Sequence, residues 1–144
     1  MSAPRILMVD DSPADRASVR IAFEQAGFGI DLSFAENTTQ AMGLLRDGAR
    51  PQGHALPHLV LLDIHMPGGS GLDLLAAMKK DKSLCEIPVW MLSGTNNRRD
   101  IRAAYRRHAS GFFRKPDDFD GLRRLADLIS RLCLEALAFP GAEN

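Results

Sequence analysis

The chain has 144 residues, of which 45% are hydrophobic, and its 18 basic and 18 acidic side chains cancel. This length and composition are typical of one globular domain with a core of its own. The balanced charge argues against binding to nucleic acid or to an anionic membrane surface, since both need a strong positive field.

We expect a single domain over residues 1–144, with its core at about 4–138 and a short C-terminal tail. No apolar stretch approaches the length of a membrane span, and Asp10-Asp11 interrupts the first apolar run too early for a signal peptide. The two cysteines, Cys85 and Cys133, match no metal or redox spacing. A cytoplasmic protein with two reduced thiols is therefore expected.

Five segments have the pattern of β-strands. Residues 6–9, 59–62 and 89–92 are continuous apolar runs, as in parallel strands covered on both faces. Phe112-Phe113 is a shorter run, and residues 30–35 alternate between apolar and polar side chains. The sequence thus predicts five strands, three of them deeply buried.

Helical periodicity fills the intervals between these strands. The expected helices cover residues 15–26, 37–46, 72–78, 100–108 and 122–137, and Ser12-Pro13 is a start signal for the first. The segment 47–57, rich in Gly and Pro, is expected to be a surface loop. Regular alternation of strand and helix predicts an α/β fold, a doubly wound parallel sheet with helices on both faces.

Chemically reactive side chains stand where these strands end. Asp10-Asp11 follow the first strand, Asp63 follows the third, Ser93 the fourth, and Lys115 the fifth. The carboxyl ends of parallel strands share one rim, where ligands bind. Three carboxylates there would repel one another unless a hard cation such as Mg²⁺ lay between them. One carboxylate could then attack a phosphoryl group, with the lysine and the hydroxyl holding its oxygens.

Taken in order, these motifs resemble the receiver domain of two-component response regulators over essentially the whole chain. The matching residues are Asp10-Asp11, Leu61-Leu-Asp63-Ile-His-Met-Pro67 with Gly71, Ser93, and Lys115-Pro116. The resemblance implies a flavodoxin-like fold with five strands in the order 2-1-3-4-5. It also implies that a sensor histidine kinase phosphorylates Asp63.

The same resemblance implies roles for the other site residues. Asp11 and Asp63 would bind Mg²⁺ (or Mn²⁺) directly, Asp10 mainly through water, and His65 through its backbone carbonyl. Ser93 and Lys115 would bind the phosphoryl group. The peptide bond between Lys115 and Pro116 is expected to be cis, as X-Pro bonds permit.

Three further positions concern switching and phosphoryl lifetime. Phe112 matches the aromatic residue that rotates inward when Ser93 moves toward the phosphoryl group. His65 and Thr95 match two positions that tune the lifetime of that group in the family. Two interpretations of His65 stay open: its side chain restricts or orients the attacking water, or it points to solvent and only its carbonyl matters.

The last expected helix has more apolar surface than one core face needs. We predict a symmetric homodimer through the fourth helix, the fifth strand and the fifth helix. The interface residues would be Leu122, Leu128, Leu134, Leu137 and Phe139. The alternative is a tail folded back on its own domain. The basic fourth helix is a solvated face or a docking surface for an acidic partner, and His54 and His58 are expected at the surface.

The leading function is a stand-alone response regulator that signals through protein–protein contacts and is not an enzyme beyond its own phosphoryl transfer and loss. The alternatives are a phosphorylation-independent binding module and a phosphorelay intermediate. Phosphohydrolases of the haloacid dehalogenase type carry a second acid where this chain has His65, which argues against them. Residues 11–15, the loop before the third strand, and residues 130–140 resemble regulators that partner phytochrome kinases, so a bacteriophytochrome is a candidate kinase.

Overall fold

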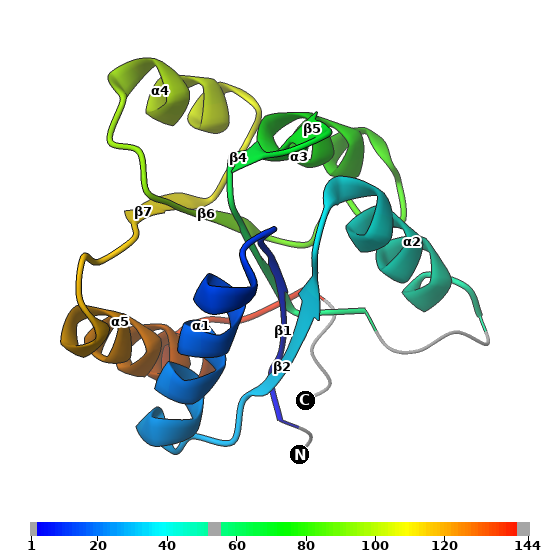
Figure 1. The fold of residues 1–144 in the computed structure, drawn as a ribbon. Coiled ribbons are helices and arrows are strands. Elements are labelled where there is room, and N and C mark those ends of the chain that lie inside the picture. Colours follow the sequence, from blue (N-terminus) through cyan, green and yellow to red (C-terminus); the bar gives the residue numbers. More distant parts are fainter. Residues whose placement is uncertain (1–2, 52–55, 141–144) are drawn as a thin grey trace.

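The computed structural model describes residues 3–51 and 56–140, and His54 lies outside them. A five-stranded parallel sheet forms its centre (Figure 1). The strand order is β2-β1-β3-β6-β7, which confirms the expected order 2-1-3-4-5 once a separate hairpin is left out of the count. The strands are β1 (Arg5–Val9), β2 (Asp31–Ala35), β3 (Leu59–Leu62), β6 (Val89–Ser93) and β7 (Gly111–Arg114).

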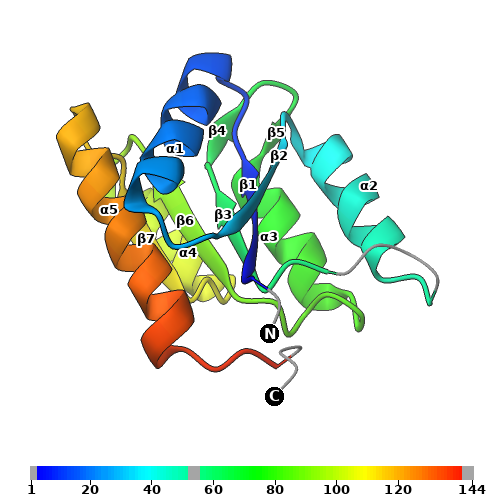
Figure 2. The same cartoon turned by 90° about the horizontal axis from the view of Figure 1, so that it is seen from below.

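Helices cover both faces of this sheet, which confirms the doubly wound, flavodoxin-like architecture (Figures 1 and 2). One face carries α1 and α5, which lie side by side, and the other carries α2, α3 and α4. Their bounds are α1 (Pro13–Ala26), α2 (Thr38–Gly48), α3 (Gly71–Lys80), α4 (Arg98–Arg106) and α5 (Phe119–Arg131). The expected loop at 47–57 therefore begins two residues late, because α2 continues through Gly48.

The continuous apolar strands follow from this sandwich, since alternate side chains enter two separate cores. Along β1, Leu7 and Val9 join the cluster under α2, α3 and α4. Ile6 and Met8 join the cluster under α1 and α5. The latter cluster also holds Trp90, whose ring meets Phe113 edge-on at 5.4 Å between centroids.

Side-chain caps fix where the helices begin at the carboxyl rim of the sheet. The Ser12 hydroxyl accepts a hydrogen bond from the backbone N–H of Asp15 at 3.2 Å, and Pro13 occupies the first turn of α1. The Asn37 side chain caps α2 in the same way through the N–H of Gln40, at 2.7 Å. Each cap turns the chain sharply after a strand, so the polar residues of the turns stay at the rim.

Two elements were not anticipated from the sequence. The turn after Asp63 forms an antiparallel hairpin of β4 (His65–Met66) and β5 (Gly69–Ser70). The last helix continues from α5 into a π-helical stretch, η1 (Leu132–Ala136). None of the helices in the described part of the chain is long and apolar enough to cross a membrane.

The C-terminal segment folds back on its own domain. Phe139 is half-buried against the core under α1 and α5, and its ring centroid lies 5.6 Å from that of His58. His58 is itself half-buried, contrary to the expected surface position, and its Nδ1 accepts a hydrogen bond from the Arg5 N–H at 2.9 Å. Burial, together with the charge of Arg5, lowers the pKa of His58.

Candidate functional site

The expected reactive residues converge at the carboxyl rim of the sheet. Parallel pairing of β1 with β3, and of β3 with β6, brings the residues that follow their last pairs to one place. Asp10 is fully buried there, and Asp63 and Ser93 are 8% and 1% exposed. The fold thus holds two carboxylates and a hydroxyl where little water reaches them.

Three carboxylates form a compact group at this rim. Oxygen atoms of Asp10, Asp11 and Asp63 all lie within 4.8 Å of one another. Their mutual repulsion and their hard oxygen donors suit a divalent cation of the Mg²⁺ type. The donor set therefore fits the metal that the sequence predicts.

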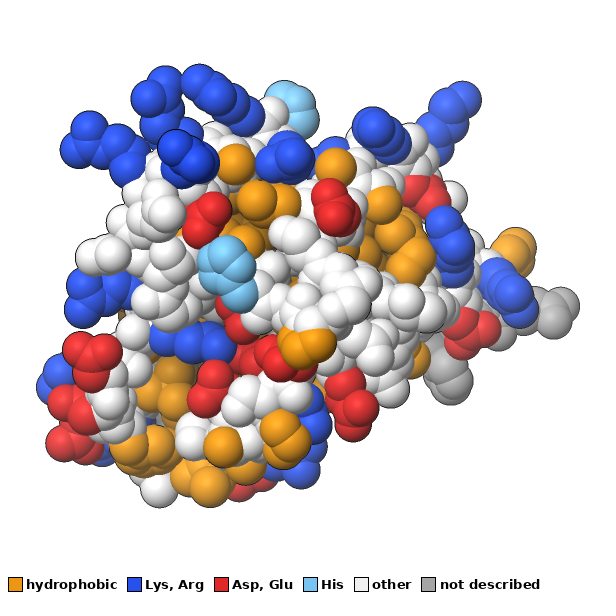
Figure 3. Space-filling model, turned by 45° about the horizontal axis from the view of Figure 1, so that its top comes forward, with side chains coloured by type: hydrophobic (Ala, Val, Ile, Leu, Met, Phe, Trp, Pro, Cys, Tyr) orange, Lys and Arg blue, Asp and Glu red, His pale blue; other side chains and the backbone are white. Residues whose placement is uncertain are grey.

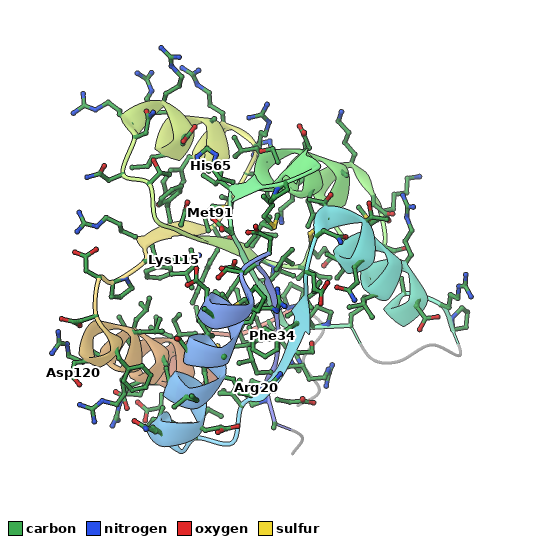
Figure 4. All side chains as sticks on the ribbon, in the orientation of Figure 1. Arg20, Phe34, His65, Met91, Lys115 and Asp120 are labelled. Atoms are coloured by element: carbon green, nitrogen blue, oxygen red, sulfur yellow. The ribbon has the colours of Figure 1, made fainter. Side chains whose placement is uncertain are left out.

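Lys115 reaches into the same group from the end of β7 (Figure 4). Its Nζ donates to Asp10 Oδ2 at 2.6 Å, to Asp15 Oδ2 at 2.9 Å and to Asp63 Oδ2 at 3.4 Å. Burial lowers the pKa of the Lys115 ammonium, but the hydrogen bonds to Asp10 and Asp15 and the nearby carboxylate charges outweigh burial and raise it overall. The lysine therefore stays cationic and balances the acids around it.

The environment of Asp63 opposes its ionisation. Burial raises the pKa of this carboxyl, the charge of Lys115 lowers it, and the charge of Asp10 raises it further. Hydrogen bonds from Lys115 and Ser93 lower the pKa again without cancelling the effect of burial. Asp63 is consequently more basic than an ordinary aspartate, which favours it as a nucleophile when ionised.

Backbone contacts fix the two loops that carry the carboxylates. Asp10 Oδ1 accepts from the Ser12 N–H at 2.9 Å, and Arg16 Nη1 donates to the Asp10 carbonyl at 2.8 Å. The Gly71 N–H donates to the Ile64 carbonyl at 2.8 Å. A Cβ atom on Gly71 would lie 1.9 Å from the Asp63 carbonyl oxygen, so only glycine fits at this position.

The His65 side chain contacts an acidic residue of α4. It is exposed, and its Nε2 lies 3.0 Å from Asp100 Oδ2. Its effect on the attacking water stays a prediction. Figure 4 shows His65 between the β4 strand and α4. The contact links the loop that carries Asp63 to a helix on the surface of the domain.

The other switch and lifetime candidates lie beside the site. Phe112, in β7, is half-buried against the core under α2, α3 and α4. The Thr95 N–H donates to Ser93 Oγ at 3.5 Å, and the Thr95 hydroxyl accepts from the N–H of Asn97. Their dynamic roles stay predictions.

The expected cis peptide bond between Lys115 and Pro116 is not found. All peptide bonds of the described residues are trans, this one included. Trans is also the intrinsically favoured isomer of an X-Pro bond. Pro116 packs closely against the start of α5, where a Cβ atom on Gly121 would lie 2.8 Å from Pro116 Cβ.

The residues expected at a dimer interface divide into two groups. Leu128, Leu134 and Leu137 are 48%, 46% and 38% exposed. Leu122 and Phe139 are half-buried and pack against the core of their own domain. An interface at this end of the chain would therefore be built around the three exposed leucines of α5, η1 and the residue after η1.

Sequence reasoning missed Asp15 as a member of the site. Asp15 lies in the first turn of α1, immediately beyond the rim where β1 ends. Its position four residues after Asp11, next to a helix start signal, was the available cue, because that turn must face the same rim. The missed pair of His65 and Asp100 joins segments 35 residues apart and leaves no local pattern.

The parallel sheet and the acidic rim with its lysine are those expected of a receiver domain, and the comparison with known families agrees. The chain belongs to the response regulator receiver domain family, whose model matches residues 6–127.

Similar proteins include response regulators, one of them a phytochrome response regulator. The chain is 28% identical over 137 residues to the response regulator Rcp1 of Synechocystis sp., covering 95% of this chain and 93% of Rcp1. It is 32% identical over 138 residues to the probable methanogenesis regulatory protein FilR2 of Methanothrix harundinacea, covering 94% and 87%. The phosphorylated cyanobacterial phytochrome response regulator RcpA has a TM-score of 0.88 at 26% identity, covering 97% of this chain and all of that one. Rcp1 has been solved in a Mn²⁺-bound form, with a TM-score of 0.83.

Proposed function

We propose that this protein accepts a phosphoryl group from a sensor histidine kinase on Asp63 and signals through contacts with other proteins. The observation that carries this proposal is the position of Asp63. Its buried carboxylate lies 3.4 Å from the Lys115 ammonium. It also accepts a hydrogen bond from the Ser93 side chain. A nucleophile, a cation and a hydroxyl thus surround one small space at the rim.

In the proposed reaction, an Asp63 carboxylate oxygen forms a new P–O bond as the P–N bond to the kinase histidine breaks. The histidine nitrogen keeps the electron pair of the broken bond and takes up a proton. Lys115 and Ser93 then donate hydrogen bonds to the phosphoryl oxygens, where negative charge concentrates. The product is an acyl phosphate on Asp63.

Asp11 and Asp63 would hold Mg²⁺ or Mn²⁺ directly, with Asp10 acting through water and His65 through its carbonyl. When bound, the cation supplies charge neutralisation between the carboxylates and the incoming phosphoryl oxygens. The proposal draws support from the compact group of acid oxygens and from the Mn²⁺-bound form of the relative Rcp1.

A phytochrome-type kinase is the proposed donor, and the cytoplasm the proposed location. The support is the similarity to RcpA and Rcp1, of which RcpA is described as a phytochrome response regulator. A phosphorelay role would use the same Asp63 chemistry and pass the group onward. A phosphorylation-independent binding module would not need that chemistry.

Intact mass after incubation with acetyl phosphate tests the proposal. With Mg²⁺ present, we expect the wild type to gain one phosphoryl group and Asp63→Asn to gain none. Asp117→Asn is the matched control, because its side chain is 93% exposed and makes no contact with Lys115 Nζ in the described structure. No gain in the wild type with either acetyl phosphate or a phosphorylated kinase would favour the binding module.

The outer face of α4 is the proposed docking surface for an acidic protein partner. Five exposed arginines crowd this helix and its end, and none forms an ion pair with another described residue. Figure 3 shows basic side chains gathered over α4. These arginines are Arg98, Arg99, Arg102, Arg106 and Arg107. Arg98 and Arg99 lie at the helix N-terminus, where positive charge is unfavourable, so a partner carboxylate there would relieve repulsion.

A further inference from the structure

Asp15 is a second strong partner of the site lysine. Its Oδ2 lies 2.9 Å from Lys115 Nζ, which is closer than the 3.4 Å between Lys115 and Asp63. The side chain of Asp15 is 47% exposed, whereas Asp10, the third partner, is fully buried. Lys115 is therefore held between one fixed carboxylate and one at the solvent edge.

In this arrangement the Lys115 ammonium lies closer to Asp10 and Asp15 than to Asp63. The proposed reaction needs the ammonium close to the phosphoryl oxygens on Asp63, yet its two shortest hydrogen bonds go to Asp10 and Asp15. Asp10 cannot retreat, because Ser12 and Arg16 hold it through side chain and backbone. The contact with Asp15 can open, because that side chain is 47% exposed and can turn toward solvent while its backbone stays in the first turn of α1.

We propose that Asp15 is a positioning residue: a resting counter-ion that holds Lys115 back from Asp63 and must release it when the phosphoryl group arrives. This inference rests on the proposed function, because it concerns the lysine that would bind the transferred group. The described structure has no hydrogen bond between Asp15 and Asp63, and Asp15 contacts Lys115 instead, so its proposed action passes through the lysine.

A positioning role of this kind affects the rate of phosphorylation but not the rate of hydrolysis. The contact between Asp15 and Lys115 exists in the resting protein and is lost before the transition state of phosphorylation. It is already absent in the phosphorylated protein, from which hydrolysis begins. Removing the Asp15 charge therefore lowers the barrier to phosphorylation and leaves the barrier to hydrolysis unchanged.

The test compares phosphorylation by acetyl phosphate with loss of the phosphoryl group in Asp15→Asn. We expect the second-order rate constant of phosphorylation to rise roughly two- to fivefold, as for a half-exposed ion pair, with an unchanged half-life. Asp15→Glu keeps the charge and should behave as the wild type. Asp117→Asn removes an exposed acid from the loop that follows Lys115, has Arg114 rather than Lys115 as its ion-pair partner, and should change neither rate. An unchanged or slower phosphorylation in Asp15→Asn, or equal changes in both rates, overturns the proposal.

A Lys115→Met background separates action through the lysine from a general effect of charge. Adding Asp15→Asn to that background should leave the residual phosphorylation rate unchanged, because no ammonium remains to be released. A persisting acceleration would show that Asp15 only repels the anionic donor, and would refute the positioning role. If the wild type itself gains no phosphoryl group from any donor, the proposed function fails first, and the two failures are thus distinguishable. Urea unfolding of every variant shows that each rate belongs to folded protein.

Discussion

At the scale of single residues, burial of the Asp63 carboxylate lowers the stability of the folded protein when this group is ionised. Since its folded-state pKa is raised, protonation of Asp63 stabilises the folded protein, and this stabilisation is lost as pH rises through that pKa. The ionised group that the chemistry needs is therefore the less stable form of the fold.

We accordingly predict that Asp63→Asn is more stable than the wild type at neutral pH, by on the order of 1 kcal/mol. The advantage should shrink as pH falls through the raised pKa of Asp63, because the wild type then becomes neutral at this position too. Urea unfolding at several pH values, in the presence of a chelator, measures the difference. A variant that is less stable than the wild type at pH 7 would contradict this account.

Gly71 controls the backbone of Asp63 through space rather than through its own conformational freedom. Replacement by alanine would force a Cβ atom against the Asp63 carbonyl oxygen, and we expect a loss of about 1–3 kcal/mol of stability, as in overpacked cores. Chemical denaturation measures this loss. Gly43→Ala is the control: nothing lies within 4 Å of its Cβ position in the exposed middle of α2, so stability should stay equal or rise. Equal effects of both changes would argue against the steric explanation.

Much of the site could be predicted residue by residue. Strand ends gave Asp10, Asp63 and Ser93, because parallel strands deliver their carboxyl ends to one rim. Asp15 and the partner of His65 could not be predicted in this way. Their positions depend on how far the first turns of α1 and α4 project over the rim, which hydrophobic periodicity does not encode.

At the scale of elements, the β4–β5 hairpin connects the loop after Asp63 to α2 and α4. His65 on β4 contacts Asp100 in α4, and a Cβ atom on Gly69 of β5 would meet the Thr38 hydroxyl at the start of α2. Residues 65 and 70, and 66 and 69, pair across a turn at Pro67-Gly68, where Gly68 takes a φ of 79° that glycine adopts without strain.

The contact between His65 and Asp100 fixes the imidazole two residues after Asp63, and we predict that it limits access of water to the phosphoryl group. His65→Asn should shorten the phosphoryl half-life about two- to fivefold, and Asp100→Asn should do the same by releasing the ring. The half-life is measured by intact mass after removal of the donor. Unchanged half-lives in both variants would leave only the His65 carbonyl as relevant. Arg102→Gln, on the same helix and free of contact with His65, is the control.

The expected helices were found, while their ends were harder to predict. Caps such as Ser12 and Asn37 carry a local signal that a sequence displays. The π-helical turn of η1 carries none, since it depends on how Cys133 packs into the core under α1 and α5. The fold-back of Phe139 likewise depends on a distant residue, His58.

At the scale of the whole molecule, the exposed leucines of the C-terminal helix remain without cover from the described part of the chain. Leu128 and Leu134 lie on α5 and η1, on the side away from the core. Isolated exposed leucines are ordinary, but together with Leu137 they give this end of the molecule an apolar surface. A second copy of the chain is the proposed cover.

We predict that the protein is a dimer and that Leu128→Glu or Leu134→Glu weakens it at least about tenfold, because the interface would then bury an unpaired charge. Sedimentation velocity over a concentration series measures the association. Leu44→Glu on α2 is the matched control, since Leu44 is 47% exposed but lies on the opposite face of the sheet. A wild type that stays monomeric at high concentration would rule the interface out.

Because the core is divided into two clusters, the fluorescence of the single tryptophan reports on only one face of the sheet. Trp90 is the only tryptophan of the chain, and it lies in the core under α1 and α5, against Phe113. Phe112, the neighbouring residue in β7, points into the other core. Tryptophan fluorescence, excited apart from tyrosine, therefore reports on α5 and the C-terminal segment, where association would occur, and not on α4. A dye attached to α4 would complement it, so that the two optical signals separate events on the two faces of the sheet.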